Sequence, residues 1–302
     1  MMNITTLPIS IVTACRNCER YVEKTILSVV GQDYPLLQYI VVDGASTDST
    51  LKIVNKHQDR ISKVISEPDS GQYHGIQKGM NLCDGEVMAY LNADDTYYPW
   101  TFSVVNEVFM KFPEVEWIIG QPGYMNAESQ CIRISGNAGT AYPREYIRNG
   151  WFRSSLAGYL QQESMFWRRS LWEKTGGLSP DYKYAADFEL WTRFAEHTEL
   201  FSVAVPLALF RKRPGEQKSS LGKIQYDKEV SEICRNRKPP SVLWRSITHG
   251  NQIREYIYRM LVWKKCNVIA YSEKESGWVI RKNTIRPISR VSLSEAILHV
   301  KL

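Results

Sequence analysis

The sequence of 302 residues predicts an α/β fold, with a mainly parallel central sheet flanked by helices. In the first hundred residues, short β-branched runs alternate with longer runs whose apolar residues recur at helical spacing. Several strand-like runs end directly in polar or acidic residues, which is where ligands bind in open parallel sheets. With 43% hydrophobic and 12% aromatic residues, the chain can bury a large core, and this composition argues against intrinsic disorder.

Residues 8–95 are expected to alternate strictly between strands and helices. The helical runs place apolar residues three or four positions apart, as at Val22, Ile26 and Val29. The strand runs are short, continuously apolar and bounded by Pro, Gly or acidic residues. This alternation is typical of βαβ units, in which neighbouring strands run parallel. The predicted strands are 8–15, 38–44, 61–68 and 85–95, and the predicted helices are 19–32, 46–59 and 75–83.

The rest of the chain is expected to be less regular. Residues 122–150 are rich in Gly, Asn, Pro and Tyr, which indicates a loop. The sheet is expected to end near residue 214, so that a first domain spans residues 1–215 and a basic, largely helical extension spans residues 216–302. The other predicted elements are helices 99–113 and 185–198, strands 116–121 and 201–213, and a strand followed by a helix in 163–178, which Gly176 and Gly177 should end.

The net charge of +6 is unevenly distributed. Residues 1–210 hold 18 Lys or Arg and 24 Asp or Glu, a net charge of −6, whereas residues 211–302 hold 20 and 8, a net charge of +12. An acidic region can bind a cation, and a basic region favours phosphate groups of lipids, nucleotides or nucleic acids. The two regions are therefore expected to have different roles.

We expect the protein to lie in a reducing, cytoplasmic setting, because its six cysteines are scattered and the sequence has no long apolar segment. The CRNC segment at 15–18 has no second cysteine pair or neighbouring histidine that would complete a zinc site. No run of about 18 apolar residues predicts a membrane-spanning helix. The first ten residues lack the basic start and apolar core of a signal peptide, so secretion by that route is not expected.

Acidic residues at the ends of predicted strands are the strongest functional signal. Asp94 and Asp95 directly follow an apolar strand, and Asp43 and Asp69 follow two others. Mg²⁺ and Mn²⁺ prefer oxygen ligands and are usually held by one or two carboxylates together with substrate phosphates. An ordinary helix-capping turn would explain the Asp94–Asp95 pair alone, but not acidic residues at three strand ends. We therefore predict a divalent metal beside a phosphate-bearing ligand.

Two further segments suggest a function, and each has a simpler alternative. Asp187 begins a predicted helix, where it could act as a general base or merely cap the helix. Residues 240–265 combine an approximate apolar face with five basic residues and two tryptophans. That pattern is typical of a helix on an anionic membrane surface, but also of a helix that packs its apolar face on the first domain.

Six segments of the chain together resemble a known family. In order they are IVTACRN, VVDGASTDST, SEPDSGQYHGIQKG, GEVMAYLNADD, QQESMFWRR and AADFELWTRFA. They resemble the family 2 glycosyltransferases, which have the GT-A fold, and are most similar to bacterial members that build surface polysaccharides, including enzymes of the colanic-acid type. The resemblance spans roughly residues 7–215.

This resemblance implies the inverting transfer of a sugar from a nucleotide diphosphate donor to an acceptor hydroxyl, with Mg²⁺ or Mn²⁺ as cofactor. It implies that Asp187 is the catalytic base and that Asp95 is the metal ligand. Gln162 and Glu163 occupy the segment that lines the acceptor site. The donor-binding residues that it implies are Thr13, Asn17, Asp43, Asp69, Gly71, Lys78, Asp94 and Arg211.

The expected acceptor is a glycan or a lipid-linked glycan at the inner face of the plasma membrane, which residues 240–265 would contact; no nucleic-acid partner is expected. The chain departs from the family pattern at His74 and Gln77, where an Asp and an Asn are usual, and at Ala186, where an acidic residue is usual. A nucleotidyltransferase that makes sugar nucleotides is one alternative, although the first strand lacks the expected Gly-rich basic loop. A non-catalytic module that binds nucleotide sugars is the other.

Overall fold

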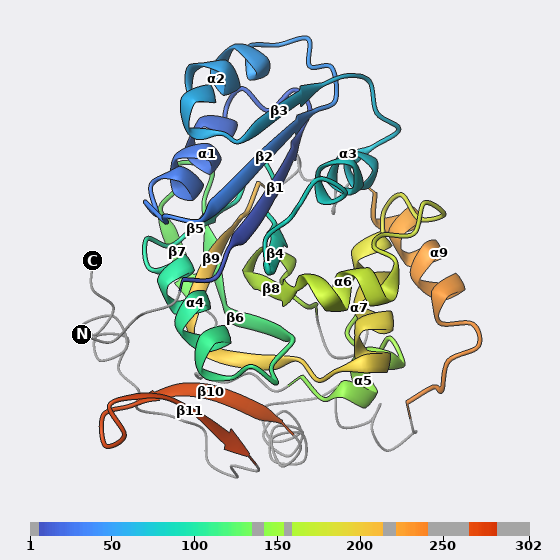
Figure 1. The fold of residues 1–302 in the computed structure, drawn as a ribbon. Coiled ribbons are helices and arrows are strands. Elements are labelled where there is room, and N and C mark those ends of the chain that lie inside the picture. Colours follow the sequence, from blue (N-terminus) through green and yellow to red (C-terminus); the bar gives the residue numbers. More distant parts are fainter. Residues whose placement is uncertain (1–5, 135–141, 154–158, 214–221, 241–265, 283–302) are drawn as a thin grey trace.

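The computed structural model describes residues 6–134, 142–153, 159–213, 222–240 and 266–282. These residues form a mixed α/β fold, in which helices pack on a large central sheet (Figure 1). The predicted alternation in the first part of the chain is confirmed. Its elements are β1 (Ile9–Cys15), α1 (Val22–Val30), β2 (Leu37–Asp43), α2 (Thr50–Lys56), a 3₁₀ turn η1 (Gln58–Arg60), β3 (Lys63–Ser66), α3 (Gln72–Met80) and β4 (Val87–Tyr90).

The second part of the chain completes the sheet and adds helices to it. Its first elements are β5 (Thr96–Tyr97), α4 (Thr101–Lys111), β6 (Trp117–Met125), β7 (Cys131–Ile134), α5 (Arg144–Arg148) and a 3₁₀ turn η2 (Gln162–Ser164). They are followed by β8 (Met165–Arg168), α6 (Arg169–Thr175), α7 (Ala186–His197), β9 (Phe201–Arg211), α9 (Lys223–Ile233), β10 (Asn267–Ser272) and β11 (Gly277–Lys282).

The described strands form one sheet of 11 strands. Its N-terminal half, β3-β2-β1-β4, is parallel as predicted. β8 then runs antiparallel between β4 and β6, so the second half of the sheet is mixed. The main path has the order β11-β10-β9-β6-β8-β4-β1-β2-β3, with β5 paired to β9 and β7 paired to β6.

The register of the parallel strands aligns their carboxyl ends. Cys15, the last residue of β1, lies opposite Asp43, the last residue of β2. Asp43 in turn lies opposite Ser66, which ends β3. The loops that leave these three strands therefore begin at the same level, at one edge of the sheet.

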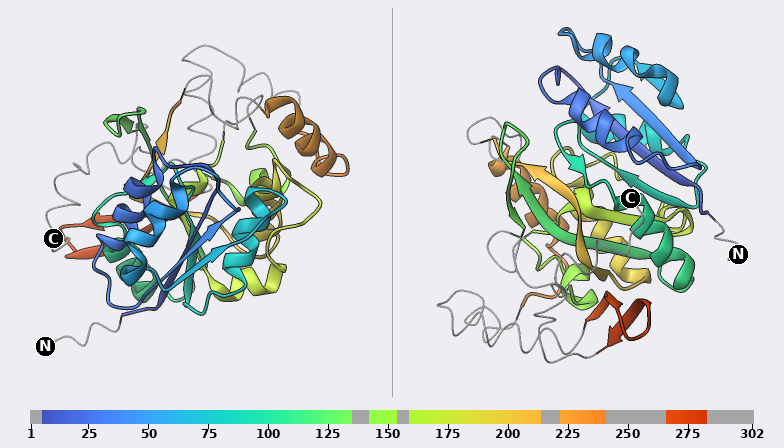
Figure 2. Two further views of the ribbon diagram at one scale, coloured as in Figure 1. Left: turned by 90° about the horizontal axis from the view of Figure 1, so that it is seen from above. Right: turned by 90° about the vertical axis from the view of Figure 1, so that its left-hand side faces the viewer.

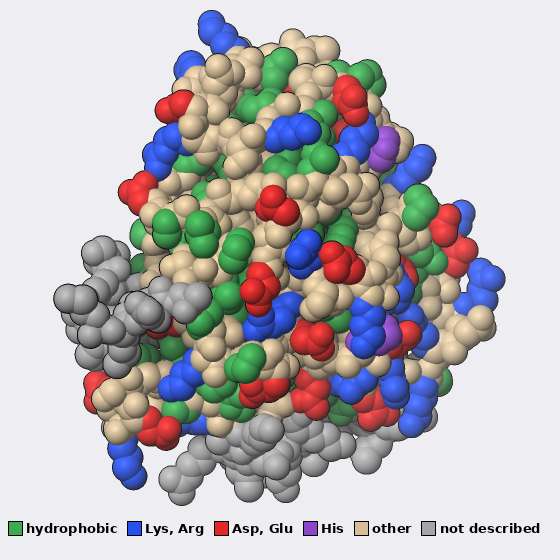
Figure 3. All heavy atoms as spheres, in the orientation of Figure 1, with side chains coloured by type: hydrophobic (Ala, Val, Ile, Leu, Met, Phe, Trp, Pro, Cys, Tyr) green, Lys and Arg blue, Asp and Glu red, His purple; other side chains and the backbone are tan. Residues whose placement is uncertain are grey.

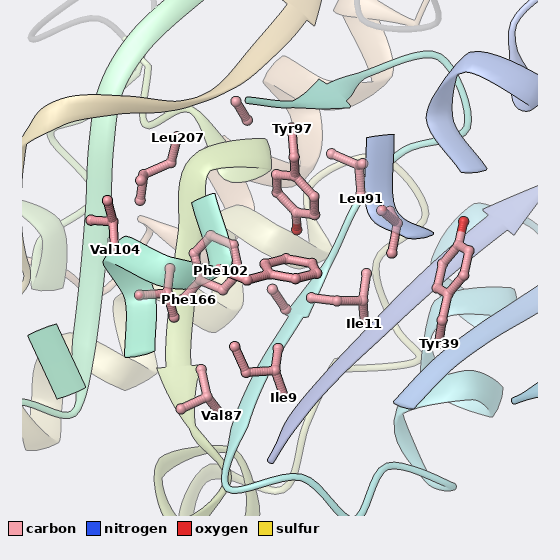
Figure 4. Close-up of a cluster of buried hydrophobic side chains, with 14 of the residues drawn as sticks. Ile9, Ile11, Tyr39, Val87, Leu91, Tyr97, Phe102, Val104, Phe166 and Leu207 are labelled. Carbon is pink, nitrogen blue, oxygen red and sulfur yellow. The ribbon is translucent and has the colours of Figure 1, made fainter. Parts of the chain in front are cut away.

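Aromatic side chains fill the core on the face of the sheet covered by α1 and α4. Phe102, Phe166 and Tyr97 meet there, and the Tyr97 ring centroid lies 5.4 Å from each of the other two (Figure 4). Ile9 and Ile11 of β1 point into the same cluster and are fully buried. Burying a side chain of this size contributes about 1.5–3 kcal/mol to folding.

The opposite face of the sheet carries a second cluster, which fixes α7 in place. Trp191 of α7 stacks on Trp117 of β6 and meets Trp167 of β8 edge-on, each at a centroid distance of 5.5 Å. Val12 points into this cluster while its neighbour Ile11 points into the other, as alternation along a buried strand requires. These contacts pack α7 against this face of the sheet.

Residues 122–150 contain more regular structure than the sequence predicts. β6 continues through Pro122 to Met125, and β7 and α5 lie in the same stretch. Gly123 is required in this strand because a Cβ there would lie 2.7 Å from the main-chain oxygen of Ala208 on β9. A glycine that indicates a loop by composition here permits close strand pairing.

The expectation that the sheet ends near residue 214 is wrong. β10 pairs with β9, and β10 and β11 form an antiparallel hairpin at the far end of the sheet from β3 (Figure 2). Trp278 anchors the hairpin by donating its indole N–H to Glu107 of α4 at 2.7 Å. Of the proposed membrane-contacting segment 240–265, all but Pro240 lies outside the described residues.

No helix in the described ranges has both the length and the apolar character needed to cross a bilayer. On the face of the molecule shown in Figure 3, acidic and basic side chains are interspersed. Charge on this face is therefore spread over the surface, and the functional carboxylates are identified by their burial and contacts.

Candidate active site

Asp43 organises the loop that leaves β2. Its side chain is fully buried and accepts hydrogen bonds from the Ser46 amide at 3.1 Å and from the Ser66 hydroxyl at 2.7 Å, and from the hydroxyl of Ser46. Ala45 has a left-handed φ of 56°, which turns the chain back over the carboxylate. Asp43 therefore lies at the predicted edge of the sheet, and its oxygens are oriented by its own loop.

The loops after β1 and β2 are joined through Asn17. The main-chain N–H of Asn17 donates to the Ser46 hydroxyl, and the side-chain oxygen of Asn17 accepts a hydrogen bond from the main-chain N–H of Thr47, both at 2.9 Å. Thr13 contributes differently, because it is fully buried and accepts a hydrogen bond from the Tyr39 hydroxyl at 3.1 Å. Asn17 is thus at the rim of the site, whereas the hydroxyl of Thr13 lies in the core.

Asp69 lies against the loop that follows β2. A Cβ on Gly44 would lie 2.6 Å from a carboxylate oxygen of Asp69, so only glycine allows this approach. Asp69 also accepts a hydrogen bond from the main-chain amide of Gly71. Gly71 directly precedes the first residue of α3 and has a φ of +140°. Lys78 is turned toward Glu67, with which it forms an ion pair at 2.7 Å, and toward the main-chain oxygen of Pro68.

Asp95 is buried behind the rim of the site. It is 1% exposed, and its two oxygens accept the Arg211 amide at 2.8 Å and the Asn92 side-chain amide at 3.1 Å. Burial, followed by the charges of Asp94 and Glu163, raises the pKa of Asp95 well above its ordinary value. The structure therefore disfavours the charged form of Asp95 relative to that of an exposed aspartate.

Asp94 has a more open position than Asp95. Its carboxylate is partly exposed and pairs with Arg213, while its main-chain oxygen accepts from the Arg211 side chain at 2.6 Å. The guanidinium groups of Arg211 and Arg213 lie over the Tyr21 ring, at 4.6 and 5.2 Å from its centroid. The Asp94 carboxylate is thus the charged acidic group that reaches the surface next to two cations.

Gln162 and Glu163 lie in η2, directly before β8. Gln162 donates to the main-chain oxygen of Tyr90 at 2.6 Å, which fixes the turn on the end of β4. Burial, with the charges of Asp94 and Asp187, raises the pKa of Glu163 to about 8. One oxygen of Glu163 is buried without a hydrogen-bond partner among the described residues.

Asp187 lies in the first turn of α7, which the tryptophan cluster holds in place. It accepts the Phe188 amide at 2.7 Å, and the Tyr73 hydroxyl hydrogen-bonds to its carboxylate. Burial raises the pKa of Asp187, and these hydrogen bonds offset part of that rise. Asp187 and Glu163 are close enough for the charge of one to raise the pKa of the other.

These carboxyl groups divide into two kinds. Asp95 and Glu163 are buried and have raised pKa values, whereas Asp94 is partly exposed and pairs with Arg213. Burial also raises the pKa of Asp187, which lies close enough to Glu163 for its charge to act on that carboxyl group. Clusters of carboxyl groups with shifted pKa values are typical of catalytic sites.

The sequence did not single out several residues that support this site. Gln72 of α3 donates to the side chain of Asn92 at 2.6 Å and so ties α3 to the turn that carries Asp94. Tyr73 bonds to Asp187, and Glu229 of α9 contacts the residues that precede it. A single helical glutamate such as Glu229 leaves no pattern by which it could be found from sequence.

Comparisons with known proteins agree with the fold. Residues 10–173 match the family described as glycosyl transferase family 2. An uncharacterized glycosyltransferase of Haemophilus influenzae is 22% identical over 78% of this chain and 73% of its own length. A chondroitin synthase of Escherichia coli is 21% identical over 84% of this chain, but the match covers only 36% of that protein's length. A glycosyltransferase of Nostoc matches over 33% of its own length.

Solved structures share the fold at low sequence identity. Staphylococcus aureus TarS (residues 1–349) in complex with UDP-GlcNAc has a TM-score of 0.60 and 16% identity, covering 83% of this chain and 73% of that one. The mannosyltransferase PcManGT from Pyrobaculum calidifontis, in complex with GDP-Man and Mn²⁺, has a TM-score of 0.55 and 17% identity, covering 86% and 72%. The match to the family covers more than half of the sequence, and the fold is the GT-A fold, so the chain belongs to glycosyl transferase family 2.

Proposed function

We propose that this protein transfers a sugar, with inversion, from a nucleoside diphosphate donor to a hydroxyl of a glycan or lipid-linked acceptor during synthesis of a bacterial surface polysaccharide. The observation that supports the proposal is that the buried Glu163 lies within electrostatic range of both Asp94 and Asp187. Asp94, beside Arg211 and Arg213, suits a cation and a diphosphate, and Asp187 suits an acceptor hydroxyl. The nucleotide sugars bound by TarS and PcManGT support this class of donor.

No three Asp, Glu, His or Cys side chains among the described residues are placed together to hold a metal ion, so a divalent cation would depend on Asp94 and on the donor phosphates. The charges of Asp94 and Glu163 raise the pKa of Asp95, and the charge of Asp94 raises the pKa of Glu163, so a nearby cation would offset this repulsion. Both oxygens of Asp95, the ligand predicted from the sequence, accept hydrogen bonds from the protein. We therefore favour Asp94 over Asp95, with donor phosphates completing the ligands. When bound, Mg²⁺ or Mn²⁺ would neutralise charge on the departing diphosphate.

Asp187 is proposed as the general base. A carboxylate whose pKa is raised by burial is a stronger base than an exposed one, and the Tyr73 hydroxyl orients it. It would take the proton of the acceptor hydroxyl as that oxygen attacks the anomeric carbon. Attack on the face opposite the diphosphate, in a single displacement, inverts the configuration at that carbon.

The remaining contacts of the site are proposed from position. The rim residues that would meet the donor are Asn17, Asp43, Asp69 and Gly71, with Thr13, Lys78 and Arg211 behind them as supports of the same loops. Gln162 and Glu163 would face the acceptor. Contact of residues 240–265 with an anionic membrane surface, at the cytoplasmic face, stays part of the proposal.

A panel of nucleotide sugars tests the donor and the metal together. The matching donor, at about 100 times its Kd and with Mn²⁺ present, should stabilise the fold by about 2.7 kcal/mol and raise Tm by roughly 5 °C. Chelation of the metal should remove most of this rise. Asp94→Asn should remove the metal-dependent part, whereas Asp84→Asn, at an exposed site outside the cluster, should not. A chain that no nucleotide sugar stabilises would contradict the proposed donor class.

The rate of transfer should depend on pH through Asp187. Because the pKa of Asp187 is raised, the base is protonated at a higher pH than an ordinary aspartate, whose pKa is about 3.9. We therefore expect kcat/KM to fall as the pH is lowered through that raised pKa, with a slope of about one decade per pH unit. A profile that stays flat down to the ordinary aspartate range would contradict this assignment.

A further inference from the structure

Helix α9 lies beyond the segment that matches the family and packs directly against α7. Val230 and Ile233 of α9 form a buried cluster with Ala185 and Phe188 at the beginning of α7. This described part of the C-terminal extension therefore packs on the first domain, beside the residue proposed as base (Figure 1).

Glu229 of α9 binds the main chain that leads into α7. One oxygen of its carboxylate accepts the Lys183 amide at 3.0 Å, and the other accepts the amides of Tyr184 and Ala185 at 2.9 and 2.8 Å. Ala185 is the N-cap residue of α7, so these three donors lie in the segment that leads into the helix. A carboxylate from another helix therefore fastens this segment, two residues before Asp187.

The register of α9 against α7 is fixed at its other end as well. Arg237, just beyond α9, donates to the Thr192 hydroxyl in the middle of α7 at 2.8 Å and pairs with Glu196 at 3.5 Å. It also donates to the main-chain oxygen of Arg148 at the end of α5. With both ends fastened, α9 cannot slide along α7 without breaking these contacts.

We propose that Glu229 is a positioning residue that holds the first turn of α7, and with it the Asp187 carboxylate, in the geometry required for proton removal from the acceptor. This inference rests on the proposed function, in which Asp187 is the base. The negative charge of Glu229 has a second effect, because it raises the pKa of Asp187. The other titratable groups that face Asp187 come from α3, β4, η2 and α9, and they are Tyr73, Tyr90, Glu163 and Tyr226.

Amide hydrogen exchange tests the clamp without any substrate. In Glu229→Gln, the amides of residues 183–185 should exchange at least about tenfold faster than in the wild type, because the side-chain amide can accept from one side only. Glu232→Gln, which removes the same charge from an exposed position on the same helix, should leave their exchange unchanged. Unchanged exchange in Glu229→Gln would overturn the proposal.

The pH profile then separates positioning from a merely structural role. Release of nucleoside diphosphate is followed with the nucleotide sugar that stabilises the wild type most. Glu229→Gln should lower kcat and shift the acid limb of kcat/KM down by about half a pH unit, because a charge that favoured protonation is gone. Glu229→Asp should lower kcat, but the acid limb of kcat/KM should stay at the same pH as in the wild type. A lower rate in Glu229→Gln with an unmoved limb would overturn the proposal.

The exchange experiment and the kinetic experiment together distinguish this inference from the proposed function. If the wild type turns over no nucleotide sugar, the proposed function fails, and the exchange experiment alone decides whether Glu229 holds the start of α7. If the wild type is active and both Glu229 variants match it in rate and profile, the proposed function stands and the role of Glu229 is refuted.

Discussion

Asp187→Asn is expected to lower kcat for sugar transfer by a factor of about 10²–10⁴, the usual contribution of a general base. The amide of asparagine cannot take a proton from the acceptor, although its oxygen can still accept the Phe188 amide. The first turn of α7 should therefore keep its shape, and donor affinity should change little. Steady-state kinetics with donor and acceptor varied separately would place the loss in kcat rather than in the donor KM.

Two further variants make this test specific. Asp181→Asn, at an exposed position in the segment before α7, should have nearly the wild-type rate. Glu163→Gln should retain most of the activity at neutral pH, because a carboxyl group with a pKa of about 8 is largely protonated there and glutamine resembles that form. If Glu163→Gln abolishes transfer while Asp187→Asn does not, Glu163 is the base and our assignment is wrong.

The parallel half of the fold could be predicted from the sequence because each element there satisfies a local rule. β1, β2 and β4 are buried on both faces and form continuous apolar runs, and α1 shows its apolar face at helical spacing. Strand ends in a parallel sheet share one edge, so Asp43 and Asp94 could be assigned to that edge without coordinates.

The mixed half could not be predicted in the same way, because its pairing depends on partners far along the chain. Pro122 and Gly123 indicate a loop locally, but β9 stabilises them as a strand. Short apolar runs lie on either side of Glu273–Ser276, which indicates the hairpin β10–β11, but this pattern spans only a short segment. The same limit applies to the carboxylates, since sequence shows that Asp94 and Asp95 are adjacent but not that one faces the surface and the other the core.

Arg211→Ala should lower the free energy of unfolding by about 1–3 kcal/mol, the typical cost of leaving buried hydrogen-bond acceptors without a donor. The side chain is fully buried, and its guanidinium donates to the main-chain oxygens of Asp94, Asn126 and Ala127 at 2.6–3.1 Å. Without it these oxygens lose their donor, and the Tyr21 ring loses the cation that covers it. Urea unfolding should show a lower midpoint with an unchanged m-value.

Arg213→Ala is the matched control, because Arg213 covers the same Tyr21 ring but lies nearer the surface. Its ion pair with Asp94 is partly exposed, so the loss of stability should stay within about 1 kcal/mol. Removing a cation beside Asp94 should instead weaken donor binding, if this rim meets the diphosphate. The opposite pattern, with a stable Arg211→Ala variant that binds donor weakly, would assign the phosphate contact to Arg211, as the family resemblance predicted. Folding and donor recognition are thus expected to depend on two arginines placed two residues apart on the same strand end.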